Sequence, residues 1–168
     1  MSFNTSKLKK QSGQQSGFTL IELMIVLIIV GLVLGAGIPA LQTRVANSQA
    51  DRVADELKLD IAFARTQARV NATETGIYPH TNGWTTGWQV KQGTSVIRER
   101  GTTASPMIDS GTLTGDFDTA TPISFDRKGR AINTGKLTIK VSGCSGKRNR
   151  TLEINQIGQV IESELSCS

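Results

Sequence analysis

The feature that most constrains this chain is an uncharged, apolar segment at residues 23–43, between Glu22 and Arg44. As an α-helix this segment would be about 32 Å long, and the hydrocarbon layer of a bilayer is about 30 Å thick. Residues 1–17 carry three lysines and no acid. Because basic residues favour the cytoplasmic side, the sequence predicts one membrane-spanning helix with the following domain on the periplasmic side.

A secretory signal peptide is the alternative interpretation of the same segment. It would be cut in the small-residue stretch that ends at Ala40, and the product would be a soluble secreted domain. Two features favour an uncleaved helix: the apolar run is longer than a usual signal core, and Glu22 lies in its first turn. A carboxylate in hydrocarbon costs about 1–3 kcal/mol unless it is neutralised or paired, so Glu22 requires a partner.

The string Gly-Phe-Thr-Leu-Ile-Glu from Gly17 to Glu22, followed by the apolar run, resembles the class III signal of type IV pilins and type II secretion pseudopilins. The resemblance implies that a prepilin peptidase cuts after Gly17 and that the new terminal residue, Phe18, is methylated. It also implies that Glu22 pairs with the terminal amine of a neighbouring subunit during assembly. A contact with the helix dipole is the simpler alternative for Glu22.

Pro39 lies inside the expected helix, close after Gly35 and Gly37. A proline within a helix removes one backbone hydrogen bond and bends the axis, so the sequence predicts a kink at Pro39. Many type IV pilins have a proline at this point. The alternative is a simple exit of the helix from the membrane.

After Pro39 the pattern becomes amphipathic, with apolar residues at gaps of four and three. The residues of this stripe are Ala46, Ala50, Val53, Leu57, Ile61, Ala64 and Ala68. Their small size predicts close packing of a second layer, which we expect to be a sheet. Ion pairs between Arg52 and Glu56 and between Asp55 and Lys58 are expected on the exposed side.

Residues 76–168 carry the signals of short strands separated by turns. Asn82-Gly83 predicts a hairpin, and residues 101–120, rich in Gly, Thr, Ser and Asp, predict an exposed loop. Alternation predicts strands with one buried face, formed by Trp84, Trp88, Val90, Ile123, Phe125, Leu137, Ile139, Val141, Leu152 and Ile154. The order of these segments is similar to that of pseudopilin H and the FimU/FimT minor pilins, which share the Trp-containing hairpin, the Phe-Asp-x-x-Gly-Arg turn at Phe125–Arg130 and a final cysteine pair.

The expected fold is therefore α+β. The resemblance implies a pilin fold, in which a long N-terminal helix packs on an antiparallel β-sheet or β-sandwich domain. The expected divisions are a removed leader (1–17), a transmembrane helix half (18–43), an amphipathic helix half (44–71) and a β domain (76–168).

Cys144 and Cys167 are the only two cysteines of the sequence. An exported domain meets an oxidising compartment, so a disulfide between them is favoured over two free thiols. One histidine, His80, and no CxxC spacing argue against zinc. No catalytic motif is present, so we expect no enzyme, no cofactor and no metal. Asp109, Asp116 and Asp118 do not have EF-hand spacing and are expected to serve turns rather than calcium.

Eight basic residues and no acid lie between Arg127 and Arg150, although the net charge falls from +5 to +2 without the leader lysines. Such a run attracts phosphates in a salt-dependent way, but it contains no aromatic residue for base stacking. Some FimT-type pilins bind DNA through a Gly-Arg-x-Arg motif; the comparable turn in this chain begins at Gly158 and lacks both arginines. A solvated or subunit-contact surface is the preferred interpretation. The alternative is DNA contact by Arg127, Lys128, Arg130, Lys147, Arg148 and Arg150.

The resemblance implies a minor type IV pilin of a Gram-negative bacterium, held in the inner membrane and then moved into the pilus. Its implied partners are other minor pilins, the major pilin, the prepilin peptidase and the inner-membrane assembly platform. Its implied role is to prime assembly at or near the filament tip, in support of twitching, adhesion or DNA uptake. The alternatives are the minor pseudopilin H of a type II secretion system and a DNA-binding pilin of natural transformation.

Overall fold

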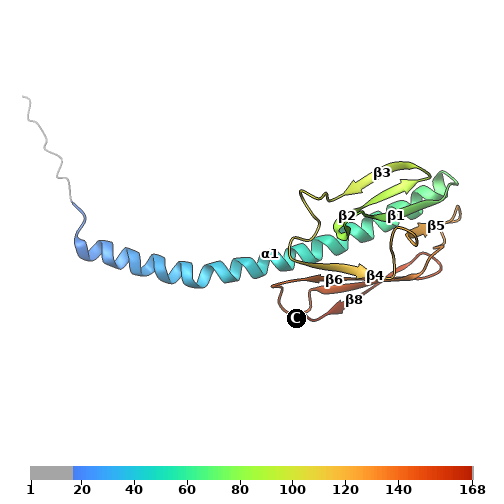
Figure 1. Ribbon diagram of the computed structural model, residues 1–168. Coiled ribbons are helices and arrows are strands. Elements are labelled where there is room, and N and C mark those ends of the chain that lie inside the picture. Colours follow the sequence, from blue (N-terminus) through green and yellow to red (C-terminus); the bar gives the residue numbers. More distant parts are fainter. Residues whose placement is uncertain (1–16, 168) are drawn as a thin grey trace, which may run out of the picture. The chain divides into compact units, whose positions relative to one another are not determined.

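The computed structural model describes residues 17–167 (Figure 1). The rest of the expected leader, residues 1–16, lies outside the described residues, as does Ser168. The chain divides into two compact units, one ending at Ile38 and one comprising Pro39–Ser168. We describe each unit by itself.

The first unit contains the start of helix α1 (Leu20–Val70). Thr19 caps this helix, because its Oγ1 accepts a hydrogen bond from the amide of Glu22 at 3.2 Å and its carbonyl oxygen accepts one from the amide of Leu23. The large apolar side chains between Phe18 and Ile38 are all 45–81% exposed. A helix that is apolar on every face is typical of membrane spans, and α1 is the one described helix long and apolar enough to cross a bilayer.

The helical assignment of α1 continues through Pro39. The proline therefore does not end the helix. The kink at Pro39 stays a prediction.

In the second unit, α1 buries the stripe that the sequence predicts. Six of its residues, Ala50, Val53, Leu57, Ile61, Ala64 and Ala68, are at most 1% exposed, and Ala46 packs against them. The two expected ion pairs on the other side form, Arg52–Glu56 at 3.5 Å and Asp55–Lys58 at 2.9 Å. The 3.6-residue period therefore describes this half of the helix correctly.

Eight strands form two four-stranded antiparallel sheets. Sheet A has the order β3-β2-β1-β5 and sheet B the order β4-β6-β7-β8. The strands are β1 (Thr75–His80), β2 (Gly83–Gln92), β3 (Ser95–Arg100), β4 (Gly111–Gly115), β5 (Ile123–Phe125), β6 (Gly135–Val141), β7 (Asn149–Ile154) and β8 (Val160–Leu165). The hairpin predicted at Asn82-Gly83 joins β1 to β2.

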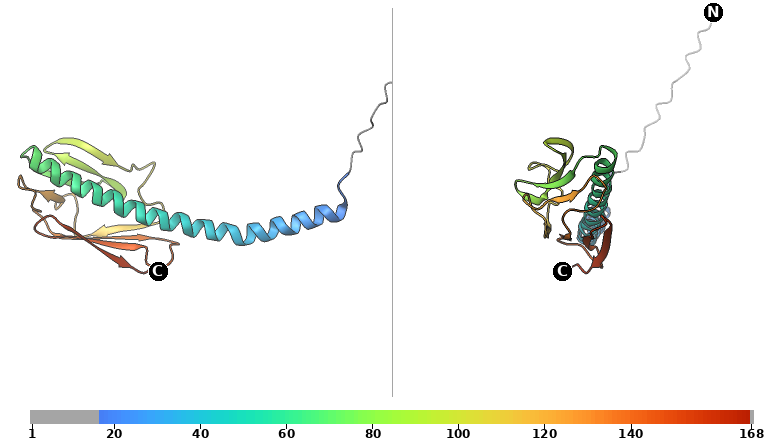
Figure 2. Two further views of the ribbon diagram at one scale, coloured as in Figure 1. Left: turned by 180° about the vertical axis from the view of Figure 1, so that it is seen from behind. Right: turned by 90° about the vertical axis from the view of Figure 1, so that its right-hand side faces the viewer.

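Both sheets pack along the C-terminal part of α1; in Figure 1, strands β2 and β3 of sheet A are drawn above the helix and sheet B below it. The end view in Figure 2 shows that they cover different sides of the helix. Trp88 and Ile77 of sheet A and Leu137 and Leu152 of sheet B are fully buried in one core with Leu57 of α1. The α+β class and the helix-on-sheet packing are confirmed.

The expectation of an exposed loop at residues 101–120 is wrong in part. This segment supplies β4, an edge strand of sheet B that pairs with β6. Its amides also bond to β2, since Ile108 N donates to the carbonyl oxygen of Thr85 at 3.2 Å. The reason is four large apolar residues within the polar composition, all at most 4% exposed: Met107, Ile108, Leu113 and Phe117.

The disulfide expected between Cys144 and Cys167 is present, with the two Cα atoms 5.7 Å apart. It joins the connection between β6 and β7 to the residues that follow β8. The amide of Cys167 also donates to the carbonyl oxygen of Gly146 at 2.9 Å. The last hairpin is thus closed covalently.

Candidate functional site

The candidate assembly segment, Gly17–Ile38, combines a protease-accessible junction with an apolar helix. Gly17, Phe18 and Thr19 precede the first helical residue, and Phe18 is 81% exposed. The Gly17–Phe18 peptide bond therefore lies outside the helical hydrogen-bond ladder, where a protease can reach it.

Glu22 is exposed in the first turn of α1, one turn beyond Phe18. Within residues 17–167 it forms no ion pair. The segment therefore presents a carboxylate at the end of an entirely apolar surface. This geometry leaves Glu22 available to a cation of another chain.

The six residues of the 127–150 run that were considered for DNA contact separate into two groups. The first occupies the turn after β5, where Asp126 organises the backbone. The Oδ1 atom of Asp126 accepts from the amides of Lys128 and Arg130 at 2.8 and 2.9 Å, and its Oδ2 atom pairs with Arg130 at 2.9 Å. These contacts, chiefly the backbone N–H of Arg130, hold the pKa of Asp126 below its ordinary value. Arg65 of α1 donates to the carbonyl oxygen of Gly129 at 2.9 Å and holds the turn on the helix.

The second group forms an ion network with α1 and β8. Asp51 pairs with Arg148 at 2.8 Å and with Arg150 at 3.0 Å, and Arg150 also pairs with Glu162 at 2.9 Å. Arg150 is only 8% exposed. Glu162 pairs in turn with Lys58 at 2.7 Å, and this contact raises the pKa of Lys58. Arg148 and Arg150 therefore fasten β7 to the helix.

The structure thus does not bring the six predicted DNA-contact residues into one surface. The first group lies beside Arg65 and the second beside Asp51, which are separated by about 21 Å along α1. The run itself contains no acid, but in the folded domain Asp51 of α1 and Glu162 of β8 pair with its arginines. Lys147 remains exposed, but the arginines next to it are engaged.

Each of the three loop aspartates accepts a hydrogen bond within the domain, and Asp118 serves a turn, as the sequence predicts. Asp118 Oδ1 accepts from the amides of Ala120 and Thr121 at 2.8 and 2.6 Å, and these bonds lower its pKa. Asp116 accepts from the amide of Lys136, and Asp109 from the side chain of Gln49. Among the residues that the structure describes, no group of three His, Cys, Asp or Glu side chains could hold a metal ion.

A buried carboxylate on α1, Asp60, was not predicted. It is fully buried, and it pairs with Arg98 at 2.7 Å and with Arg100 at 3.1 Å, while Trp88 Nε1 donates to it at 2.9 Å. It therefore fastens sheet A to α1 as the Asp51 network fastens sheet B. Its spacing from Leu57 places it on the buried face, which is the one signal in the sequence that could have revealed it.

An exposed junction before an exposed apolar helix, together with a helix-on-sheet domain, defines a type IV pilin-like protein. Residues 12–38 match the family model described as prokaryotic N-terminal methylation motif, and residues 53–158 match the one described as Type II transport protein GspH. The second match covers more than half of the chain. The chain belongs to the GspH family, whose members are structural subunits related to pilins.

Two pilins of Moraxella bovis, the type IV major alpha-pilin and fimbrial protein Q, are each 51% identical to the chain over 43 residues. The match covers 26% of this chain and 27% of each relative, so the chain spans about a quarter of their length. The crystal structure of the type IV minor pilin FimU of Pseudomonas aeruginosa PAO1 is similar with a TM-score of 0.54. It is 18% identical, and the match covers 72% of this chain and 96% of the chain in that crystal structure. This likeness shows the shared fold.

Proposed function

We propose that this chain is a minor type IV pilin, a structural subunit that helps to prime pilus assembly and is incorporated at or near the filament tip. The observation that supports this most is the assembly segment, in which every large apolar side chain from Phe18 to Ile38 is exposed and Glu22 forms no ion pair within residues 17–167. Such a surface is stable in a bilayer or against other apolar helices, and not in water.

The proposed assembly step begins with cleavage after Gly17 by the prepilin peptidase and methylation of Phe18. The cut creates an ammonium group on Phe18. In the low dielectric of packed helices, an unpaired carboxylate is costly and an ammonium–carboxylate pair offsets this cost. Glu22 of one subunit would then bind the terminal amine of its neighbour, and each added subunit would supply one acid and one amine.

The proposed location follows from the basic leader. It would keep the N-terminus in the cytoplasm and place the second unit, Pro39–Ser168, in the periplasm before assembly. From there the chain would join other minor pilins and the major pilin through the assembly platform. The similarity to FimU, described as a minor pilin, supports a minor rather than a major subunit.

The test is the N-terminal sequence and mass of the mature protein. Methylated Phe18 at the terminus is the expected result. A terminus near Ala40 would overturn the proposal, because Phe18 and Glu22 would then be discarded as part of a signal peptide. Deletion of the gene should also lower pilus number and twitching, and unchanged piliation would remove the priming role.

A second candidate is the minor pseudopilin H of a type II secretion system, favoured by the match of residues 53–158 to Type II transport protein GspH. The same cleavage and helix packing serve both systems. The two candidates differ in what a deletion abolishes. Loss of protein secretion with normal piliation would select the pseudopilin, and the reverse would select the pilin.

A further inference from the structure

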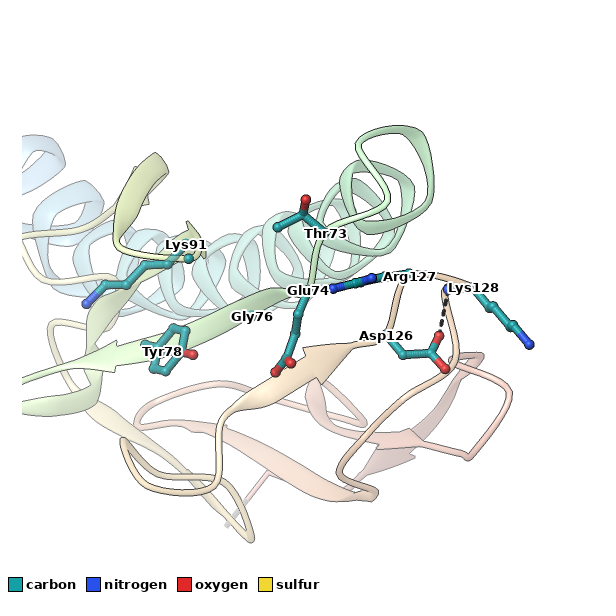
Figure 3. A pocket seen from close by; sticks show the side chains of 9 residues that line it. Thr73, Glu74, Gly76, Tyr78, Lys91, Asp126, Arg127 and Lys128 are labelled. Atoms are coloured by element: carbon teal, nitrogen blue, oxygen red, sulfur yellow. Dashed lines mark hydrogen bonds between the residues drawn. The ribbon is translucent and has the colours of Figure 1, made fainter.

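A pocket of about 570 Å³ lies between strands β1 and β2 and the turn at residues 126–128 (Figure 3). It is on the face of sheet A that points away from the core, since Ile77 and Val90 point inward and their neighbours alternate outward. Neither the assembly segment nor the Asp51 network includes a residue of this pocket.

The strand wall of the pocket is built around a glycine. Gly76 pairs with Lys91 across the sheet, and a Cβ atom on Gly76 would lie 2.8 Å from Cε2 of Tyr78. The absence of a side chain at Gly76 therefore allows the Tyr78 ring to lie over it. The ammonium of Lys91 lies 5.1 Å from the centre of that ring, in cation–π contact.

The opposite wall is the turn held by Asp126 and Arg65. Because the backbone on both sides of Arg127 is fixed by hydrogen bonds, the start of its side chain is positioned before any ligand arrives. Figure 3 shows Arg127 extending toward Glu74 and the start of β1, whereas Lys128 extends the other way. Lys91 lies beside Tyr78 and extends away from Arg127, so the two cations stand at opposite ends of the pocket.

The charges of the pocket favour one kind of ligand. Asp126 is balanced by Arg130, whereas Lys91, Arg127 and Glu74 form no ion pair within residues 17–167. Two cations without an acidic partner among residues 17–167, on either side of one carboxylate, suit a ligand with spaced carboxylates and hydrogen-bond donors between them. A phosphate polymer fits less well, because its backbone has no N–H group to donate to Glu74 and because Lys91 covers a face of the aromatic ring that lines the pocket.

We propose that this pocket binds an acidic peptide segment of a neighbouring filament subunit. One carboxylate of the segment is held by Arg127 and a second by Lys91, and a peptide N–H donates to Glu74. The acidic peptide as ligand is inferred from the charges and shape of the pocket, whereas the identity of the partner as a filament subunit rests on the proposed function.

The direct test measures fluorescence anisotropy of the full chain in detergent with a labelled pentapeptide that contains three consecutive glutamates. The glutamine version of the peptide should not bind. Arg127→Ala should weaken binding about tenfold, the usual size for a lost charge-assisted hydrogen bond. Gly76→Ala should also weaken it without a change in charge, because it displaces Tyr78.

Lys140→Ala is the matched control, since Lys140 is an exposed cation of β6 in the other sheet. An equal loss with Lys140→Ala, equal binding of the glutamine peptide, or tighter binding of an oligothymidylate than of the peptide would each overturn the proposal. Absent peptide binding in a protein that still matures at Phe18 and supports piliation would refute this inference alone. Maturation near Ala40 with intact peptide binding would refute the proposed function and leave the pocket in place.

Discussion

The two halves of α1 differ in how far they expose the same type of residue. Leu27 in the assembly segment is 62% exposed, whereas Leu57 in the second unit is fully buried. Both are leucines in one assigned helix, so helix propensity does not separate them. The difference is that Leu57 packs in one core cluster with Trp88 and Leu137, whereas among residues 17–38 Leu27 has no buried apolar side chain to pack against.

This difference shows in which process each half of α1 gains the free energy of burying its apolar side chains. Burying a leucine contributes about 1.5–3 kcal/mol, and in the second unit this is gained on folding of the single chain. In the assembly segment it can be gained only in a bilayer or against other chains. Substitutions in the first half should therefore change assembly, and substitutions in the second half should change stability.

The substitution expected to have the largest effect on assembly is Glu22→Gln, which keeps the shape of the side chain and removes its charge. We expect incorporation into filaments to fall by more than about tenfold, because an unpaired ammonium would remain buried in each new contact. Immunoblots of sheared filaments measure the effect. The melting temperature of the protein should stay unchanged, and Glu164→Gln, at an exposed acid of β8, is the matched control.

In the second unit the largest effect is expected for Asp60→Ala. The substitution leaves Trp88 Nε1 without its acceptor and Arg98 and Arg100 without their carboxylate, which should lower the free energy of unfolding by about 3–5 kcal/mol. Denaturant titration of the full chain in detergent measures it. Asp55→Ala removes an ion-paired acid whose side chain is 66% exposed and should cost less than about 1 kcal/mol. Equal losses for the two variants would contradict the structural role of Asp60.

A smaller effect separates the two arginines bound to Asp51. Arg150→Ala should lower the free energy of unfolding by about 1–2 kcal/mol, because its side chain is 10% exposed and joins two acids. Arg148→Ala should cost less than about 1 kcal/mol, since its side chain is 45% exposed. The same denaturant titration distinguishes them. If both variants instead lowered affinity for DNA equally and left stability unchanged, the basic run would be a nucleic-acid surface after all.

The smallest effect concerns pH. The pKa of Asp126 lies below the ordinary value of 3.8, first because of the backbone N–H of Arg130. A depressed pKa means that the stabilising contacts of the turn are fully present above pH 3.8 and are lost as the pH falls through the lower folded value. Carbon NMR of the carboxyl group measures this titration. Arg130→Ala should leave most of the shift, because the backbone N–H remains.

Local pattern was enough to predict much of the fold. The stripe from Ala50 to Ala68, the hairpin at Asn82-Gly83 and the alternating strand at residues 137–141 all depend on neighbours in sequence, and the structure has them. The cysteine pair was predicted from number and compartment. The prediction of an exposed loop at residues 101–120 was wrong in part, because it relied on the polar composition of the segment and not on Ile108, Leu113 and the other apolar residues within it.

The charged contacts could not be predicted, because their partners are far apart in the chain. Asp60 meets Arg98 and Arg100 at separations of 38 and 40 residues. Arg150 meets Asp51 at a separation of 99 residues. A run that lacks acids in sequence therefore acquires them from α1 and β8, which sequence spacing does not encode. The pocket of Tyr78 and Arg127 was missed for the same reason.

The closed last hairpin has a mechanical consequence. Tension along α1 in the second unit is transmitted to the connection between β6 and β7 by two contacts. Asn47 accepts a hydrogen bond from the amide of Ser145 at 2.9 Å, and Asp51 forms an ion pair with Arg148. Both contacts load the hairpin that Cys144–Cys167 encloses. If the strands of that hairpin separate, the disulfide still prevents the chain between the two cysteines from extending. Their sequence separation of 23 residues corresponds to roughly 75–80 Å of extended chain. The subunit can therefore yield under tension at its last hairpin without lengthening there.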